Sequence, residues 1–395
     1  MQYDSTAPRV DYEEAAKQAS YKLSVENIDG SIDIIFNLPK NSKLAKKLRL
    51  NKELSTRQTN KVPYGQISEI KRSDSSLGKT KQGEKKLKND SVKNRQVSGK
   101  KTMYPVTLES QYVINNPDIC KTDSKINFLV IVHTATNHFQ RRRTIRETWA
   151  NIHVLKNGGL KVVFMLGLSK DKSEKLMIEN ENTVYKDIVQ GNFLDSYHNL
   201  THKGVLAYRW ITEHCSNAEM IVKVDDDVFV NIFMLLDHYL PLFRQKSKFM
   251  QCQVRPKGTS IIQRSGGKWK VVPDEFKNMT HYPVQYCNGY MVLMTPDMIR
   301  GLYKASYLTP FFWVDDVYLY GLLPFKVGGV QFENLGSNVT LNENYGLDCF
   351  SGNTTCKLVG SYAAKEGRME QMWYASLNMF RDIAKRYLPI EMFIT

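Results

Sequence analysis

Three adjacent carboxylates, Asp225, Asp226 and Asp227, stand inside the apolar stretch IVKVDDDVFVN of residues 221–231. Side chains alternate along an extended backbone, so Asp225 and Asp227 are expected on one face and Asp226 on the other. Two carboxylates on one face at a strand end are hard oxygen ligands for a divalent cation, which removes their repulsion. Such a cation can hold a diphosphate and neutralise its charge as it leaves. The alternative is an acidic surface turn, which the apolar neighbours disfavour.

A second acidic pair, Asp315 and Asp316, lies in the stretch FFWVDDVYLYGLL of residues 311–323. The pair opens a helix-like run, where carboxylates also interact favourably with the helix dipole. Helix capping is therefore one interpretation of these residues. The other is a general base that stands close to bound substrate.

The elements that must position these carboxylates alternate between strands and helices. Short apolar runs typical of buried parallel strands occur at 127–134, 161–168 and 219–224. Helical patterns occur at 140–151, 172–185, 195–215 and 231–243. The alternation predicts an α/β sandwich with a largely parallel sheet, whose ligands bind at the carboxyl ends of the strands. Neither G-x-G-x-x-G nor G-x-x-x-x-G-K-[ST] occurs, which disfavours a dehydrogenase-type dinucleotide fold and a P-loop.

The net charge of +15 is concentrated in one segment of this 395-residue chain. Between Lys40 and Lys101 there are 19 Lys and Arg against 5 Asp and Glu, so the rest is nearly neutral. The segment has almost no aromatic residues to stack on bases, which argues against nucleic-acid binding. Its few apolar residues predict a mostly disordered basic stem or linker over residues 1–110. Residues 111–395 are then expected to form one globular domain.

The features that bear on the compartment disagree. The longest apolar stretch near the start, IDIIF, is far shorter than the roughly 20 residues of a membrane-spanning helix, so the residues alone predict a soluble chain. An even count of 6 cysteines suits an oxidising compartment, where Cys349 and Cys356 can close a short loop. Five N-x-S/T sequons point the same way, at Asn89, Asn199, Asn278, Asn338 and Asn353. Six buried thiols and chance sequons are the alternative.

Four stretches, in this order, resemble motifs of the β1,3-galactosyltransferase family of Golgi glycosyltransferases, which also includes β1,3-N-acetylglucosaminyltransferases. They are RRRTIRETW, DSYHNLTHK, KVDDDVFVN and VDDVYLYG. The usual family forms are close to R-R-x-x-I-R-x-T-W, D-S-Y-x-N-L-T-x-K, K-x-D-D-D-V-F-V-N and E-D-V-Y-x-G. A looser fifth match is HYPVQYCNGYMVLM, and together the matches span residues 128 to about 330.

The resemblance implies a GT-A fold, a nucleotide-sugar-binding α/β sandwich with a metal-binding D-x-D. It also implies an inverting mechanism, in which an acceptor hydroxyl attacks a UDP-α-sugar and a β1,3 linkage results. The implied donor is UDP-galactose, followed by the UDP-N-acetylhexosamines, and the implied acceptor is a glycan on a glycoprotein or glycolipid. Mn²⁺ or another divalent cation is the implied cofactor. Golgi membrane association is implied by the resemblance only.

The resemblance also assigns the donor site. Asp225 and Asp227 match the metal-binding positions, with Asp227 as the expected direct Mn²⁺ ligand. Asp226 completes the D-D-D motif and is grouped with Asp225 in the donor site. Arg142 and Arg146 match the basic helix near the donor and are expected to neutralise the negative charge of the donor phosphates. A structural ion pair explains Arg146 equally well.

The resemblance makes Asp316 the catalytic base and places Asp315 beside it. Asp315 stands where the family has Glu, which keeps the charge and shortens the reach. Trp313 suits stacking on a sugar ring as well as packing, whereas Trp149 is expected in the core. The last histidine is His281, so the chain offers no histidine beyond the base as a further metal ligand.

Two further departures are CNGYMV in place of a glycine-rich G-x-G-Y after Tyr-Cys, and a sequence in which the membrane anchor typical of the family is not recognised, as expected of a fragment, a variant isoform or a divergent member. A second hypothesis stands beside the enzyme: a catalytically inactive relative that serves another glycosyltransferase as partner or chaperone. Retention of both groups of carboxylates favours the enzyme.

Overall fold

The computed structural model describes residues 24–28, 31–35, 110–121, 125–152, 155, 158–352 and 354–389. The chain divides into two units, Met1–Lys93 and Asn94–Thr395. In the first, β1 (Ser24–Ile28) and β2 (Ser31–Ile35) pair as an antiparallel hairpin, a regular element that the composition of this segment did not predict. Most of the predicted stem lies outside the described residues, and its boundary near residue 110 stays a prediction.

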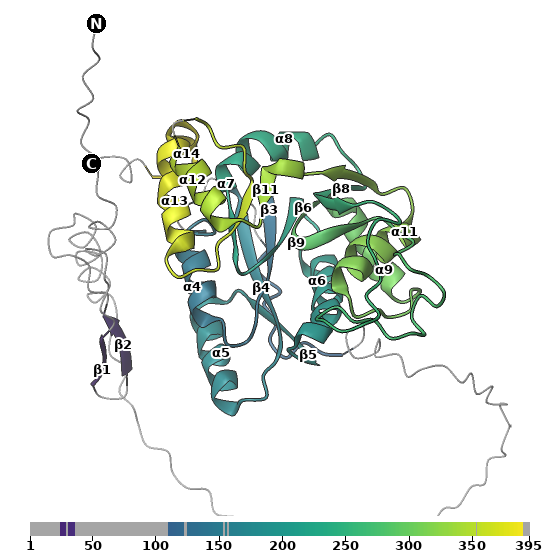
Figure 1. Ribbon diagram of the computed structural model, residues 1–395. Helices are drawn as coiled ribbons and strands as arrows, with labels where there is room; N and C mark the ends of the chain where they lie inside the picture. Colours follow the sequence, from purple (N-terminus) through teal and green to yellow (C-terminus); the bar gives the residue numbers. More distant parts are fainter. Residues whose placement is uncertain are drawn as a thin grey trace, which may run out of the picture. The chain divides into compact units, whose positions relative to one another are not determined.

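A seven-stranded sheet forms the centre of the second unit, in the order β10-β8-β9-β6-β3-β4-β5 (Figure 1). β9 runs antiparallel to its neighbours β6 and β8, and the other pairings are parallel. The strands are β3 (Ile126–His133), β4 (Leu160–Leu168), β5 (Ile188–Leu194), β6 (Ala218–Asp225), β8 (Phe249–Arg255), β9 (Tyr286–Met294) and β10 (Gln331–Asn334). The predicted α/β fold with a mostly parallel sheet is confirmed.

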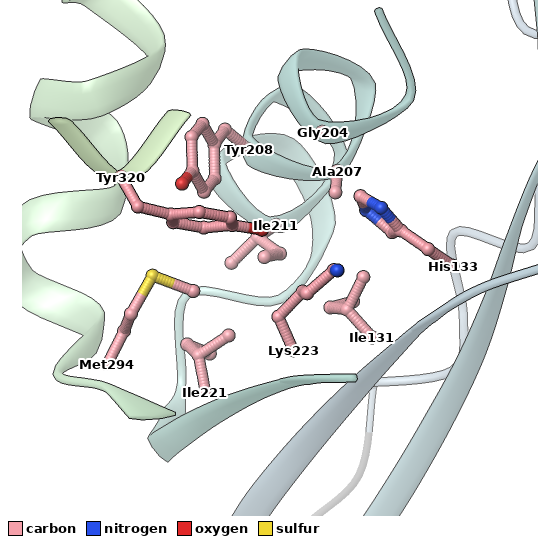
Figure 2. Close-up of a pocket in the computed structure, with 10 residues that line it drawn as sticks. All are labelled: Ile131, His133, Gly204, Ala207, Tyr208, Ile211, Ile221, Lys223, Met294 and Tyr320. Atoms are coloured by element: carbon pink, nitrogen blue, oxygen red, sulfur yellow. The ribbon is translucent and has the colours of Figure 1, made fainter. Parts of the chain in front are cut away.

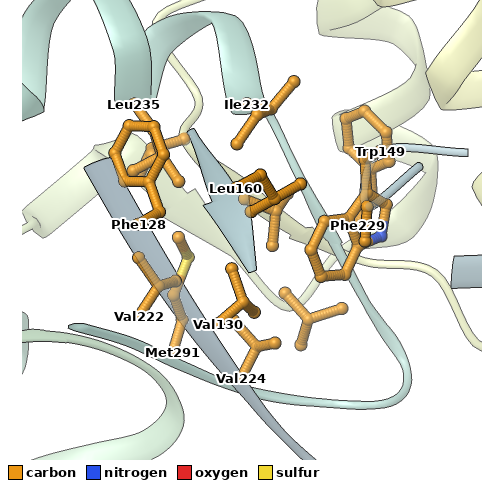
Figure 3. Packing of buried hydrophobic residues seen from close by; sticks show 14 of the residues in the cluster. Phe128, Val130, Trp149, Leu160, Val222, Val224, Phe229, Ile232, Leu235 and Met291 are labelled. Atoms are coloured by element: carbon orange, nitrogen blue, oxygen red, sulfur yellow. The ribbon is translucent and has the colours of Figure 1, made fainter. Parts of the chain in front are cut away.

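Both faces of the sheet are buried, as the continuous apolar runs of its strands require. In β3, Phe128 and Val130 pack on one face, and Leu129 and Ile131 pack on the other. Figure 3 shows the first face, where Trp149 is completely buried. The prediction that Trp149 belongs to the core is confirmed.

Helices cover the two faces. The first face carries α4 (Phe139–Glu147), α5 (Lys172–Tyr185), α8 (Leu240–Phe243), α12 (Glu343–Ser351), α13 (Arg368–Met379) and α14 (Arg381–Tyr387). The second carries α6 (Leu200–His214), α9 (Ile299–Ser306), α10 (Asp315–Val317) and α11 (Leu323–Val327). Local signals explain some boundaries: Asp171 caps α5 by accepting the Ser173 amide at 2.6 Å.

Two predicted helices are interrupted. The predicted helix at 195–215 begins as a 3₁₀ turn, Tyr197–Asn199, before α6. The predicted helix at 231–243 consists of α7 (Ile232–Met234), a π-helical turn and α8. A small second sheet follows the order β11-β12-β7, formed by Val339–Thr340, Gly360–Tyr362 and Val228–Val230.

Three disulfides account for the six cysteines: Cys120–Cys215, Cys252–Cys287 and Cys349–Cys356. The predicted pairing of Cys349 with Cys356 is therefore confirmed, and the buried-thiol alternative is wrong. Cys252–Cys287 joins β8 to β9, the strand that contacts the acidic cluster described below. Within the described residues, no helix combines the length and the hydropathy needed to cross a membrane.

The sequons differ in accessibility. Asn89 and Asn353 lie outside the described residues. Asn278 is exposed, whereas the amides of Asn199 and Asn338 donate hydrogen bonds within the protein. Asn278 is thus the sequon within the described residues whose amide is best placed for modification.

Candidate active site

Asp225 is the last residue of β6, at the carboxyl end of the strand where the sequence predicted a ligand site. Its side chain is 41% exposed, and its Oδ1 accepts a hydrogen bond from Lys223 Nζ at 2.6 Å. Lys223 itself is buried. A buried ammonium needs a carboxylate or carbonyl partner, so Lys223 orients the Asp225 carboxylate while leaving it accessible.

Asp226 points away from solvent, as strand alternation predicts. Its carboxylate accepts hydrogen bonds from Thr134 Oγ1 at 2.6 Å and Arg141 Nη1 at 2.7 Å, and lies 2.7 Å from His138 Nδ1. Burial opposes ionisation, but these partners, His138 foremost, outweigh it and hold the pKa of Asp226 below its ordinary value. Asp226 therefore holds Arg141 and the turn at residues 226–227 in place, and its carboxylate is not available to bind a ligand.

Asp227 is partly exposed and has a weaker partner, Arg141 Nη1 at 3.3 Å from Oδ2. Burial and repulsion from Asp225 and Asp226 raise its pKa above the ordinary value. Two accessible hard carboxylates with unbalanced negative charge fit a divalent cation. Among the residues that the structure describes, no cluster of three His, Cys, Asp or Glu side chains forms a fuller ligand set.

The second acidic pair occupies the first turn of α10. Asp316 Oδ1 accepts a hydrogen bond from the Gly289 amide at 2.9 Å. Burial raises the pKa of Asp315 to about 6, with Lys223 opposing the shift. Burial, and then repulsion from Asp315, raises the pKa of Asp316 well above its ordinary value. Both carboxyl groups are partly exposed, so each is accessible to a proton donor.

One residue of β9 connects the two acidic groups. Lys223 Nζ donates to the Gly289 carbonyl as well as to Asp225, and the Gly289 amide donates to Asp316. A Cβ at position 289 would lie 2.2 Å from Asp316 Oδ1, so only glycine permits this approach. Residues about 90 positions apart in the sequence thus form one acidic cluster.

Behind this cluster lies a small chamber (Figure 2), which Lys223, His133 and Tyr320 help to line. Its volume is about 10 Å³, room for one water molecule at most. His133 is buried there without hydrogen-bond partners, and burial together with Lys223 lowers its pKa. A ligand larger than a water molecule therefore cannot occupy this chamber.

The structure does not bring the two predicted donor-site arginines into the acidic cluster. Arg142 is completely buried, and its guanidinium is occupied by Glu181 and the carbonyl groups of Ala135 and Thr136. Arg146 donates to Glu181 at 2.6 Å and to Asp187 at 2.7 Å. These contacts explain Arg146 as a structural ion-pair partner and do not support phosphate binding by either residue.

Arg141, one position earlier, faces the cluster instead. Its guanidinium is about one-third exposed and contacts Asp226 and Asp227. The sequence motif RRRTIRETW contained Arg141, but residue type alone did not distinguish it from Arg142. Lys223 and Gly289 were likewise present in quoted motifs without an assigned role.

Aromatic side chains border the cluster. Trp313, just before Asp315, contacts His198 with ring centroids 4.3 Å apart and Tyr197 at 6.4 Å. Trp269, from the connection between β8 and β9, donates to the Tyr197 hydroxyl at 2.6 Å. No local pattern singled out Trp269, because its neighbours are brought to it by tertiary structure.

The Galactosyltransferase family model matches residues 140–335. Beta-1,3-galactosyltransferase 1 of Homo sapiens is 33% identical over 230 residues, which cover 58% of this chain and 68% of that protein. The chain belongs to the galactosyltransferase family. Lactosylceramide 1,3-N-acetyl-beta-D-glucosaminyltransferase A of Xenopus laevis is also 33% identical, over 226 residues, covering 55% of this chain and 59% of that protein.

Solved structures resemble this galactosyltransferase-family chain more distantly. The WbbM bifunctional glycosyltransferase has 13% identity and a TM-score of 0.35, covering 69% of this chain and 51% of its own. A glycosyltransferase involved in glycosylation of the major capsid of PBCV-1 has 9% identity and a TM-score of 0.33, covering 63% and 99%. The residues of the galactosyltransferase match include α4 from its second residue onward, both acidic groups and Gly289.

Proposed function

We propose that this chain is an inverting β1,3-glycosyltransferase that uses a UDP-sugar donor. In the proposed reaction an acceptor hydroxyl attacks the anomeric carbon of a UDP-α-sugar. The bond from that carbon to the diphosphate oxygen breaks, UDP leaves, and the acceptor proton passes to Asp316. The observation that carries the proposal is the single acidic cluster in which Lys223 and Gly289 connect Asp225 to Asp316.

The donor side of the proposal rests on Asp225 and Asp227. Their accessible carboxylates would hold Mn²⁺ or a similar divalent cation. The bound cation supplies positive charge that offsets the charge of the departing diphosphate. Arg141 lies beside Asp227 and would offer a guanidinium to the same phosphate oxygens. Asp226 keeps Arg141 in place and does not itself contact the donor.

The acceptor side rests on the second acidic pair. A general base works best when its pKa lies near the operating pH, and burial moves the pKa of Asp315 and of Asp316 in that direction. The Gly289 amide occupies Asp316 Oδ1 and orients the carboxylate so that its other oxygen is available for the proton. Asp315 contributes charge that raises the proton affinity of Asp316.

The names of the relatives guide the choice of substrates. One relative is a 1,3-galactosyltransferase and the other is a 1,3-N-acetylglucosaminyltransferase named for lactosylceramide. UDP-galactose is accordingly the favoured donor, followed by the UDP-N-acetylhexosamines, and a glycan on a glycoprotein or glycolipid is the proposed acceptor. Three disulfides support an oxidising compartment, and we propose the Golgi lumen.

The test is sugar transfer by the full chain with Mn²⁺ and each of three UDP-sugars, alongside UDP binding by calorimetry. Asp316→Asn should retain UDP affinity and lose about 10²–10⁴-fold in turnover, the contribution of a positioned base. Asp227→Ala should lose UDP affinity and turnover together. An Asp316→Asn protein with more than about a tenth of wild-type turnover would show that Asp316 is not the base. Wild-type protein that binds UDP but transfers none of the sugars would favour the inactive-partner hypothesis.

A further inference from the structure

The aromatic residues beside the acidic cluster form a continuous set drawn from three separate segments. Tyr197 comes from the 3₁₀ turn before α6, Trp313 from the segment before α10, and Trp269 from the β8–β9 connection. Trp269 Nε1 donates to the Tyr197 hydroxyl, and the rings of Tyr197 and Trp313 meet edge to face. We name Tyr197, Trp269 and Trp313 the aromatic platform.

The platform adjoins the proposed base. Trp313 is two residues before Asp315 in the chain. Burial raises the pKa of Tyr197 to about 12; the Trp269 hydrogen bond opposes the shift, and the negative charges of Asp315, Asp316 and Asp225 add to it. Because Trp313 directly precedes the first turn of α10 and meets the Tyr197 ring, a ligand on the platform would lie near the turn that carries Asp315 and Asp316.

The segment that carries Trp269 is held in place. The Val271 amide donates to the Gln263 carbonyl at 2.8 Å, which closes a loop around the glycine pair Gly266–Gly267. Both glycines have positive φ, so the tight reversal suits them. Val271 and Ile262 are buried and anchor the base of this loop. Trp269 is thus presented by an anchored loop.

The rings of the platform are not equally available. Lys268 Nζ lies 3.9 Å from the centre of the Tyr197 ring, where it covers one face, and 5.8 Å from the centre of the Trp269 ring, where its contact is looser. His198 packs against Trp313 at 4.3 Å. Trp269 keeps 49% of its surface exposed, a large apolar area for a residue whose indole N–H is already bonded. An exposed tryptophan held in this way has the form of a binding surface.

We propose that Trp269 is the stacking surface for the acceptor sugar, a pyranose whose apolar face rests on the indole while its attacking hydroxyl reaches Asp316. Pyranose rings present flat faces of C–H groups and an edge of hydroxyl groups, so one ring can meet both an aromatic surface and a carboxylate. Tyr197 holds Trp269 through its hydroxyl, and Trp313 forms the side of the platform nearest the base. This inference rests on the proposed glycosyl transfer and adds the residue that selects the acceptor.

The test compares donor and acceptor parameters in Trp269→Ala, Trp269→Phe and a control, Phe325→Ala. Phe325 is an aromatic residue on α11 that is 75% exposed and is no part of the platform. Methyl β-galactoside, methyl N-acetyl-β-glucosaminide and methyl β-lactoside serve as acceptors, and acceptor binding is followed by tryptophan fluorescence. Trp269→Ala should raise the acceptor KM at least about tenfold, or about 1.4 kcal/mol, with the donor KM and slow hydrolysis of the UDP-sugar unchanged.

Trp269→Phe should give an intermediate acceptor KM, because it keeps a ring but loses the hydrogen bond to Tyr197. Phe325→Ala should behave as wild type. An unchanged acceptor KM in Trp269→Ala, or no saturable fluorescence change in wild type with any of the three glycosides, would overturn the inference. A wild-type protein that neither hydrolyses nor transfers a UDP-sugar would instead overturn the proposed function, so the two failures are distinguishable.

Discussion

Replacing Gly289 with alanine tests whether β9 positions the proposed base. The new Cβ would stand 2.2 Å from Asp316 Oδ1 and 3.1 Å from Tyr320 Cε2, whereas ordinary contacts begin at 3.4 Å. The Asp316 carboxylate must therefore move by about 1 Å and weaken its hydrogen bond to the residue 289 amide. A displacement of about 1 Å in a catalytic group can cost about 10²-fold in rate, and that is the expected loss of turnover.

The assay measures turnover, UDP affinity and thermal stability of Gly289→Ala. UDP affinity should change little, because the substitution keeps the residue 289 carbonyl that accepts from Lys223, and Lys223 can still orient Asp225. The crowding should also destabilise the fold by about 1–3 kcal/mol, so rates are compared well below the unfolding midpoint. Gly301→Ala is the matched control, since its Cβ meets Val327 at an ordinary 3.4 Å and it lies in a helix that favours alanine. Folded Gly289→Ala protein with wild-type turnover would refute the positioning role.

Three further outcomes are expected. The transfer rate should fall as the pH is lowered toward about 6, because the pKa values of Asp315 and Asp316 are raised and the base becomes protonated in this range. Asp315→Asn removes the repulsion between the two carboxylates and lowers the pKa of Asp316, so the acidic limb of the pH–rate profile should move to lower pH. Glu181→Ala leaves the buried Arg142 guanidinium unpaired and should cost about 3–5 kcal/mol in chemical denaturation, with UDP binding of the folded protein unchanged. Asp227→Ala should abolish the Mn²⁺ dependence of UDP binding in calorimetry.

Local patterns were sufficient for β6, the strand that ends at the three aspartates. The apolar run of β6 ends directly at Asp225, and alternation along that backbone correctly separated buried Asp226 from its more exposed neighbours. The same reasoning missed β5, β8, β9 and β10, whose residues mix polar and apolar types. These strands form because they pair with strands that are distant in the sequence, and a local pattern does not record that pairing.

Residue type alone did not identify the partners of charged side chains. Arg142 and Arg146 match a basic helix in the sequence, but Glu181 of α5, 39 and 35 positions further on, lies against them. The disulfide between Cys349 and Cys356 was predictable because it closes a short loop. The long-range pairings and the contact of Trp269 with Tyr197 depend on the folded chain and leave no spacing signal.

The charge balance of the acidic cluster bears on the choice between an enzyme and an inactive partner. Lys223 lies within reach of Asp225, Asp315 and Asp316, and one buried ammonium cannot neutralise all three carboxylates. The pKa values of Asp315 and Asp316 are raised because desolvation, and repulsion among the carboxylates that Lys223 does not offset, oppose ionisation of both groups. Neutral side chains of similar size would fill the same positions at lower cost to stability. A protein that only binds a partner gains nothing from this arrangement, whereas a transferase needs both a carboxylate that accepts a proton near neutral pH and negative charge that attracts a cation.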